Sequence, residues 1–194
     1  MKYVCSIFFL FLISCTESKN ENLFPQYAAF IDQNISKTLP TKADHINYLE
    51  TLFEFDQSLR DPEVKIELLK KHNFDTKSVE YQQYLNKMNQ GDSITFFIAK
   101  KYLDLFGYPT FDLENYKAQS AVIAVALHQD YKKQRILFPF IYEAYKSGNI
   151  EEKRFSFLLN RMYDFKFGKR FVSNYTHTEQ EKISQLIEEL EIEN

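Results

Sequence analysis

The 194-residue chain is poor in the residues that interrupt helices or build reactive sites. It has four glycines, five prolines, two cysteines and no tryptophan. It contains neither a glycine-rich phosphate loop nor the Gly-x-Ser-x-Gly turn of serine hydrolases. The four histidines are isolated and lack the His-x-x-x-His or His-Glu-x-x-His spacing of a zinc site, so we expect no metal and no cofactor. The net charge of −3 gives no basic field for nucleic acid.

The first fifteen residues have the pattern of a bacterial lipoprotein signal. Lys2 is followed by an apolar run from Tyr3 to Ile13, and Leu12-Ile13-Ser14-Cys15 resembles the lipobox, in which the signal peptidase cuts before the cysteine. We therefore expect a signal peptide at 1–14, a lipid on Cys15 and a polar tether over 15–22. The alternatives are an ordinary secretory signal and a short membrane helix, although the run is short for a span.

This prediction has consequences for the rest of the chain. Cys5 would leave with the signal and Cys15 would carry lipid, so no cysteine would remain for a disulfide or a thiol nucleophile. The expected partners are a membrane, through the N-terminal lipid, and an unknown protein or small ligand. Thr16 is not the aspartate that marks inner-membrane retention in envelope lipoproteins, which favours the outer membrane within the cell envelope.

The remaining residues predict a single compact all-α domain over 23–194, built around one buried helix. The segment 117–130 is apolar from Ala118 to Leu127 except at two positions, so as a helix it has no face suited to water. It is too short to cross a bilayer and suits the centre of a helical domain. We expect burial of these side chains of the segment: Ala121, Ile123, Val125 and Leu127.

The glycines predict where the other helices end. Each of Gly91, Gly107, Gly148 and Gly168 follows a helical pattern, so we expect helices to stop there. The expected helices span 41–60, 62–71, 78–88, 93–105, 132–147, 149–163 and 176–191. Alternation of aromatic and polar residues over 165–172 indicates a small β-hairpin.

Two charged residues on the first of these helices are predicted to point inward. Asp56 and Arg60 continue the apolar stripe of Leu49 and Phe53, because steps of four, three and four keep to one helix face. An inward Asp–Arg pair is costly to bury and needs further partners. Both a buried ion pair that fixes the packing and a ligand-binding role fit this pattern.

His128 ends the central helix, where the helix dipole and nearby Asp130 favour its protonated form. A general base, a metal ligand and a structural hydrogen bond all fit this position. Gln134 and Arg135 begin the next helix and could donate to the open carbonyls of the central helix. We expect Asp56, Arg60 and His128 to form one polar cluster. The wider candidate set adds Gln57, Asp130, Gln134 and Arg161.

Five short motifs in register resemble the bacterial family listed as domain of unknown function 6624, over about 47–172. They are Asp56-Gln57-Ser58-Leu59-Arg60, Gly107-Tyr108-Pro109, Ala126-Leu127-His128-Gln129-Asp130, Gln134 with Pro139, and Leu159-Asn160-Arg161. The chain departs from the family pattern at Leu127, where the family has Gln, and at Asn160, where it has Asp. The closing Tyr-Gly-Thr-Gln is also missing. The family has no established activity to carry over.

Three classes of function remain open from the sequence. The missing catalytic motifs favour a non-catalytic binding or scaffold lipoprotein. A hydrolase would use His128 as its base, Asp130 or Asp56 to orient it, and Arg60 or Arg161 to bind an anionic group. The third class is a structural lipoprotein that self-associates through the exposed side of the last helix.

Overall fold

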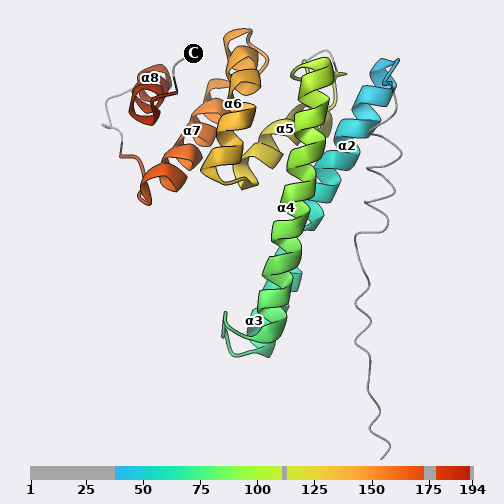
Figure 1. The fold of residues 1–194 in the computed structure, drawn as a ribbon, viewed down its shortest axis with the longest axis vertical. Helices are drawn as coiled ribbons and strands as arrows, with labels where there is room; N and C mark the ends of the chain where they lie inside the picture. The colour runs from blue at the N-terminus through green and yellow to red at the C-terminus, as the bar shows by residue number, and fades with distance from the viewer. Residues whose placement is uncertain (1–37, 111–112, 173–177, 193–194) are drawn as a thin grey trace, which may run out of the picture.

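The computed structural model describes residues 38–110, 113–172 and 178–192, and within these ranges it is all-α (Figure 1). The expected signal peptide and tether, with Cys15, lie outside the described residues. None of the described helices has a stretch long and apolar enough to cross a bilayer. The helices are α2 (Lys42–Ser58), α3 (Pro62–Lys71), α4 (Val79–Phe106), α5 (Tyr116–His128), α6 (Tyr131–Lys146), α7 (Glu152–Phe167) and α8 (Glu179–Leu190).

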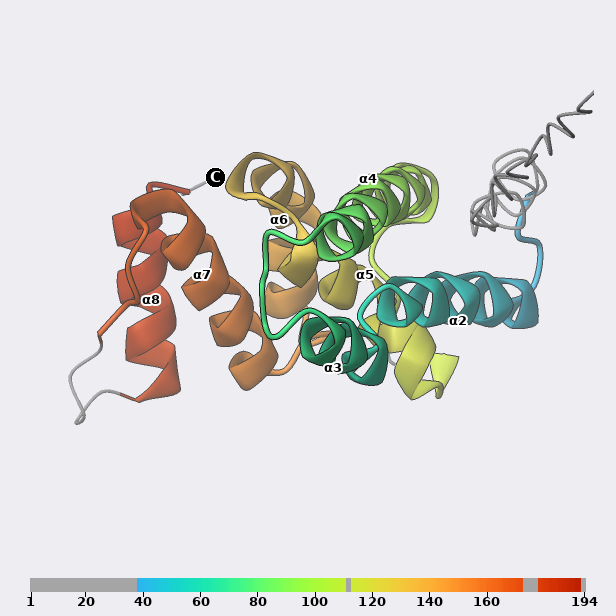
Figure 2. The same cartoon turned by 90° about the horizontal axis from the view of Figure 1, so that it is seen from below.

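The helices surround α5, which packs against α2, α4, α6 and α7. The long helix α4 lies beside α2 and projects past the other helices, and α3 lies against its projecting end (Figures 1 and 2). On the side of the molecule away from α2, α7 packs against α8 (Figure 2). The elements from α2 to α8 therefore form one continuous body with α5 near its middle.

The central helix behaves as its composition predicts. Its start is capped by Asn115, whose side-chain oxygen accepts from the backbone N–H of Ala118 at 2.9 Å. Ala121, Ile123 and Val125 are buried, which confirms that no full face of this segment is left to water. Leu127 is only partly buried, because it lies at the end of the helix and lines surface cavities.

Gly91 does not end a helix, and the two helices expected over 78–88 and 93–105 are one. Residue 91 lies in the middle of α4, and an added Cβ there would come within 2.4 Å of Cδ1 of Leu59. The glycine therefore allows the C-terminal end of α2 to pack closely against α4, and it does not mark a turn of the chain. Ser93, expected as a cap, instead donates to the carbonyl of Asn89 one turn earlier at 3.1 Å.

The prediction of a hairpin over 165–172 is wrong, because the first residues of this segment form the last turn of α7. The helix runs to Phe167 and ends at Gly168, which adopts the left-handed conformation at φ 66°. Phe167 packs on Tyr163 with a centroid distance of 4.5 Å, a contact between residues four apart on one helix. The aromatic alternation does not mark a strand face, since Phe165 and Phe167 are both largely exposed. The other predicted glycine stops, Gly107 and Gly148, are confirmed by positive φ angles.

Candidate functional site

A buried carboxylate and a partly exposed imidazole meet where α2 passes the end of α5. Asp56 on α2 is completely buried. Its Oδ2 and Oδ1 lie 2.9 and 3.1 Å from Nδ1 of His128, the last residue of α5. Gln57 donates from Nε2 to Asp56 Oδ2 at 2.9 Å. The carboxylate thus has two side-chain partners from two helices, which satisfies a group that would be costly to bury alone.

Arg60 joins this pair to a second carboxylate. Its Nη1 donates to the backbone carbonyl of Asp56 at 2.8 Å and lies 3.5 Å from Asp56 Oδ1, and its Nη2 forms an ion pair with Asp92 on α4. One guanidinium therefore bridges α2 and α4. We call Asp56, Gln57, Arg60, Asp92 and His128 the polar cluster.

The pKa of Asp92 is raised above the ordinary aspartate range. The main cause is burial, which disfavours the charged form, and the nearby Asp56 carboxylate acts in the same direction. Arg60 and His128 oppose the rise but do not cancel it. Asp92 therefore holds a proton more tightly than an exposed aspartate does.

Sequence reasoning missed Asp92, because a helix break was expected at Gly91. On the continuous helix Asp92 lies three residues before Thr95 and seven before Ala99, both buried, so it belongs to the inward face. The stripe argument that placed Asp56 inward would have found Asp92 once the helix was taken through the glycine.

Two buried glutamines tie the end of α5 to its neighbours. Gln129 donates from Nε2 to the carbonyls of Asp92 at 3.1 Å and Val125 at 3.3 Å. Gln134 on α6 donates to the carbonyl of Ala126 at 3.1 Å, as expected for a residue that satisfies the open end of the central helix. The side-chain oxygens of both glutamines are buried and have no hydrogen-bond partner within the described residues. These two side chains position the end of the helix that carries His128.

Two other residues of the candidate set lie outside the polar cluster. Asp130 is exposed and caps α6, accepting from the backbone N–H of Lys133 at 3.0 Å, and it makes no side-chain bond to His128. Arg161 on α7 is exposed, and its guanidinium lies 4.3 Å from the ring centroid of Phe165. The imidazole is therefore oriented by Asp56 and not by Asp130.

His128 lines three adjoining surface cavities, of about 450, 540 and 550 Å³. The first contains the polar cluster residues Arg60 and Asp92, the second is walled by α2, α5 and α7, and the third lies between α5 and α7. The His128 side chain is 25% exposed, whereas that of Asp56 is 0% exposed. The imidazole thus has one nitrogen held by a buried carboxylate, while a quarter of the His128 side chain is exposed.

The walls of these cavities combine cations with exposed aromatic surface. Lys133, Arg161 and Arg170 carry no ion pair to another described residue; Lys133 only touches the Ser93 hydroxyl at 3.4 Å and the Phe96 ring. Phe157 lines two of the cavities and is 62% exposed. Such walls suit a molecule with an anionic group and an apolar part. Within the described ranges no three His, Cys, Asp or Glu side chains converge as they would around a metal ion.

No family model, no curated protein and no solved structure matches this chain.

Proposed function

We propose that this protein is a lipid-anchored bacterial envelope protein that binds a small anionic molecule in the cavities around His128. The observation that carries the proposal is the contact between buried Asp56 and His128 at the point where three cavities adjoin. An imidazole held in this way stays in one orientation and presents its second nitrogen as a donor when protonated. The lipid anchor is supported by the lipobox-like sequence at Cys15.

The balance of charge favours an anion over a cation. Inside the polar cluster the carboxylates of Asp56 and Asp92 are paired with Arg60 and His128. At the rim Lys133, Arg161 and Arg170 lack ion pairs within the described residues, whereas Asp130 is engaged as a helix cap. These three cations are opposed by one lining carboxylate, Asp164, that has no ion pair to another described residue. The Arg161 guanidinium already lies over the Phe165 ring, so part of the entropy cost of fixing a long side chain is met before a ligand arrives.

The resemblance to domain of unknown function 6624 agrees with this proposal. Three of the residues that carry the resemblance, Asp56, Arg60 and His128, lie in one cluster. Asp56 and Arg60 belong to one motif, and His128 belongs to another that lies more than 60 residues later in the chain. We propose that the chain is a divergent member of that family, with the polar cluster as its binding centre.

The proposal is tested by calorimetric titration of phenyl phosphate, benzoate and a neutral phenol into the full chain in detergent. We expect the anions to bind and the phenol to bind far more weakly. Replacing Arg161 by Gln should weaken binding of the anions by about three- to tenfold, the effect of one partly exposed charged hydrogen bond. Arg135→Gln is the matched control, because Arg135 is exposed and lines none of the three cavities. Equal binding of all three compounds would refute an anion site.

A hydrolase is the second candidate, favoured by the same Asp56–His128 contact, which is the arrangement a general base requires. Turnover of p-nitrophenyl phosphate or p-nitrophenyl acetate that is lost in His128→Gln and kept in Arg135→Gln would select the enzyme over the binding module. Self-association through the last helix has no comparable observation in its favour. Of the apolar side chains of α8, Ile183, Leu186 and Leu190 are buried and Ile187 is partly buried, and the outward positions are mostly charged or polar.

A further inference from the structure

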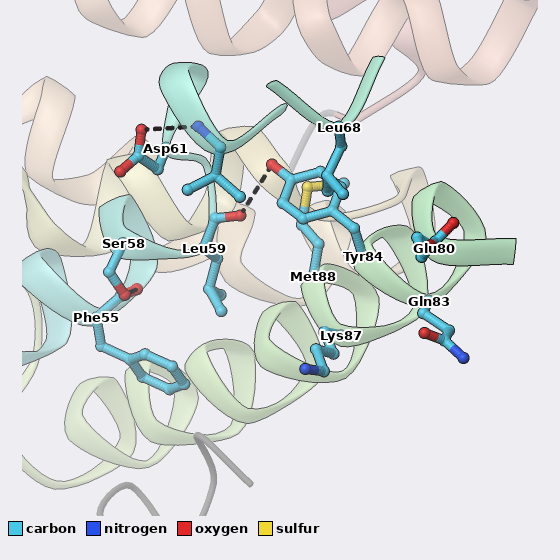
Figure 3. A pocket seen from close by; sticks show the side chains of 11 residues that line it. Phe55, Ser58, Leu59, Asp61, Leu68, Glu80, Gln83, Tyr84, Lys87 and Met88 are labelled. Atoms are coloured by element: carbon cyan, nitrogen blue, oxygen red, sulfur yellow. Dashed lines mark hydrogen bonds between the residues drawn. The ribbon is translucent and has the colours of Figure 1, made fainter. Parts of the chain in front are cut away.

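A second cavity lies between α2, α3 and α4 (Figure 3), and His128 does not line it. Its volume of about 420 Å³ is within the range of small-molecule pockets, about 300–1,000 Å³. We propose that this cavity binds a single-chain amphiphile with an anionic head, of the class of a long-chain carboxylate. Its lining shares only Met88 with the cavities around His128.

The cavity exists because α3 covers α4 without closing onto it. No residue of α3 is fully buried, although Val64 and Leu68 face the cavity. On the opposite wall Leu59 leans against Gly91, whose missing Cβ leaves room for it, and Phe55 is buried. Tyr84 reaches across and donates to the backbone carbonyl of Leu59 at 3.4 Å (Figure 3). The result is a wall of aliphatic and aromatic carbon under a helix that buries little of its own surface.

The acidic side chains around this cavity have partners, whereas the one lysine does not pair with any described residue. Glu80 is paired with Lys71 at 3.0 Å and His72 at 2.6 Å, and Asp61 caps α3 by accepting from the backbone N–H of Glu63 at 2.9 Å. Lys87 on α4 is half-buried and has no hydrogen bond or ion pair with any other residue that the structure describes. The acidic groups are therefore already satisfied, and the one cation of the lining is left to pair with a ligand.

An unpaired ammonium beside an apolar wall selects a particular class of ligand. The apolar wall favours a hydrocarbon chain, since moving each methylene from water to an apolar surface is favourable. The Lys87 ammonium favours an anionic head, and a lysine binds it as a flexible point charge that accepts carboxylate without strict geometry. A cationic amphiphile would bring two like charges together and should be rejected.

The test uses the full chain in lipid vesicles and a long-chain fatty acid that carries a photoactivatable diazirine. We expect crosslinks on peptides spanning 55–68 and 80–88, competed by unlabelled laurate. The matched diazirine fatty amine should not label these peptides. Lys87→Gln should lower the labelling about threefold or more, and Lys87→Arg should restore it. Lys101→Gln is the control, because Lys101 lies on the same helix and lines none of the described cavities.

A second variant tests whether Lys87→Gln lowers labelling only because a lost charge weakens association with the membrane. Leu68→Trp adds bulk to the partly exposed wall of α3 and should reduce labelling while the cations stay in place. Equal labelling by the fatty amine, labelling confined to other peptides, or labelling unchanged in both Lys87→Gln and Leu68→Trp would overturn the proposal.

Discussion

Both carboxylate oxygens of Asp56 lie within 3.1 Å of Nδ1 of His128, although the two residues are 72 positions apart in the chain. The contact joins a side chain with no exposed surface to one that lines three cavities. Burial and exposure are thus combined in a single pair. That combination holds the ring from inside while leaving it open to a ligand from outside.

Removal of the Asp56 carboxylate should destabilise the fold strongly. In Asp56→Ala the Arg60 and His128 side chains lose a buried partner, and breaking such a pair costs about 3–5 kcal/mol. Asp104→Ala is the control, because the Lys100–Asp104 pair is solvent-exposed and should cost under about 1 kcal/mol. Urea unfolding measures both, and similar small losses in the two variants would show that the polar cluster contributes little to stability.

Asp92 should make the free energy of unfolding depend on pH in the opposite sense to an ordinary ion-paired aspartate. Its pKa is raised in the folded state, so folding favours the protonated form. The stabilisation is complete below the unfolded-state pKa of about 3.9 and is lost as pH rises through the raised folded-state value. The stability of the wild type relative to Asp92→Asn should therefore fall as pH increases through this window. A difference that grows with pH would mean that pairing with Arg60 outweighs burial.

Two stacked tyrosines of the core should contribute to the loss of stability in alkali. Burial raises the pKa of Tyr48 and of Tyr102 to about 12, and their rings stack with a centroid distance of 5.6 Å. Because the folded-state pKa values exceed the ordinary value of about 10, their contribution is complete below pH 10 and is lost between about pH 10 and 12. Tyr102→Phe should lose less stability over this interval than the wild type. Tyrosinate absorbance that follows a single unshifted titration would contradict the burial of these hydroxyls.

Gly91 and Leu59 should show strong coupling in a double-mutant cycle. Alanine is favoured over glycine within a helix by about 1 kcal/mol, but at position 91 its Cβ would collide with the Leu59 side chain. Gly91→Ala should therefore stabilise the Leu59→Ala protein by about 1 kcal/mol and should gain less, or lose stability, in the wild type. If Gly91→Ala changed the stability of the wild type and of Leu59→Ala equally, contact with Leu59 would not explain the glycine at this position.

Much of the fold follows from the sequence because helix formation and helix burial depend on residues three and four apart. The apolar run before His128 predicts the buried central helix, and Gly107, Gly148 and Gly168 end helices through positive φ angles. The inward direction of Asp56 follows from the same periodicity, and the structure finds it fully buried.

Other features depend on how distant helices pack, and the sequence alone does not determine them. Gly91 lies inside α4 because Leu59, a residue of another element, occupies the space a side chain would need. Because α4 continues through Gly91, Asp92 lies on its inward face as a second carboxylate for Arg60. The sequence by itself determined most of the helical segments and the apolar faces of those helices, since these are local properties of the chain. The tertiary structure alone decided that Asp56 meets His128 and that Lys87 pairs with none of the residues described, since both depend on the distances between side chains of different helices.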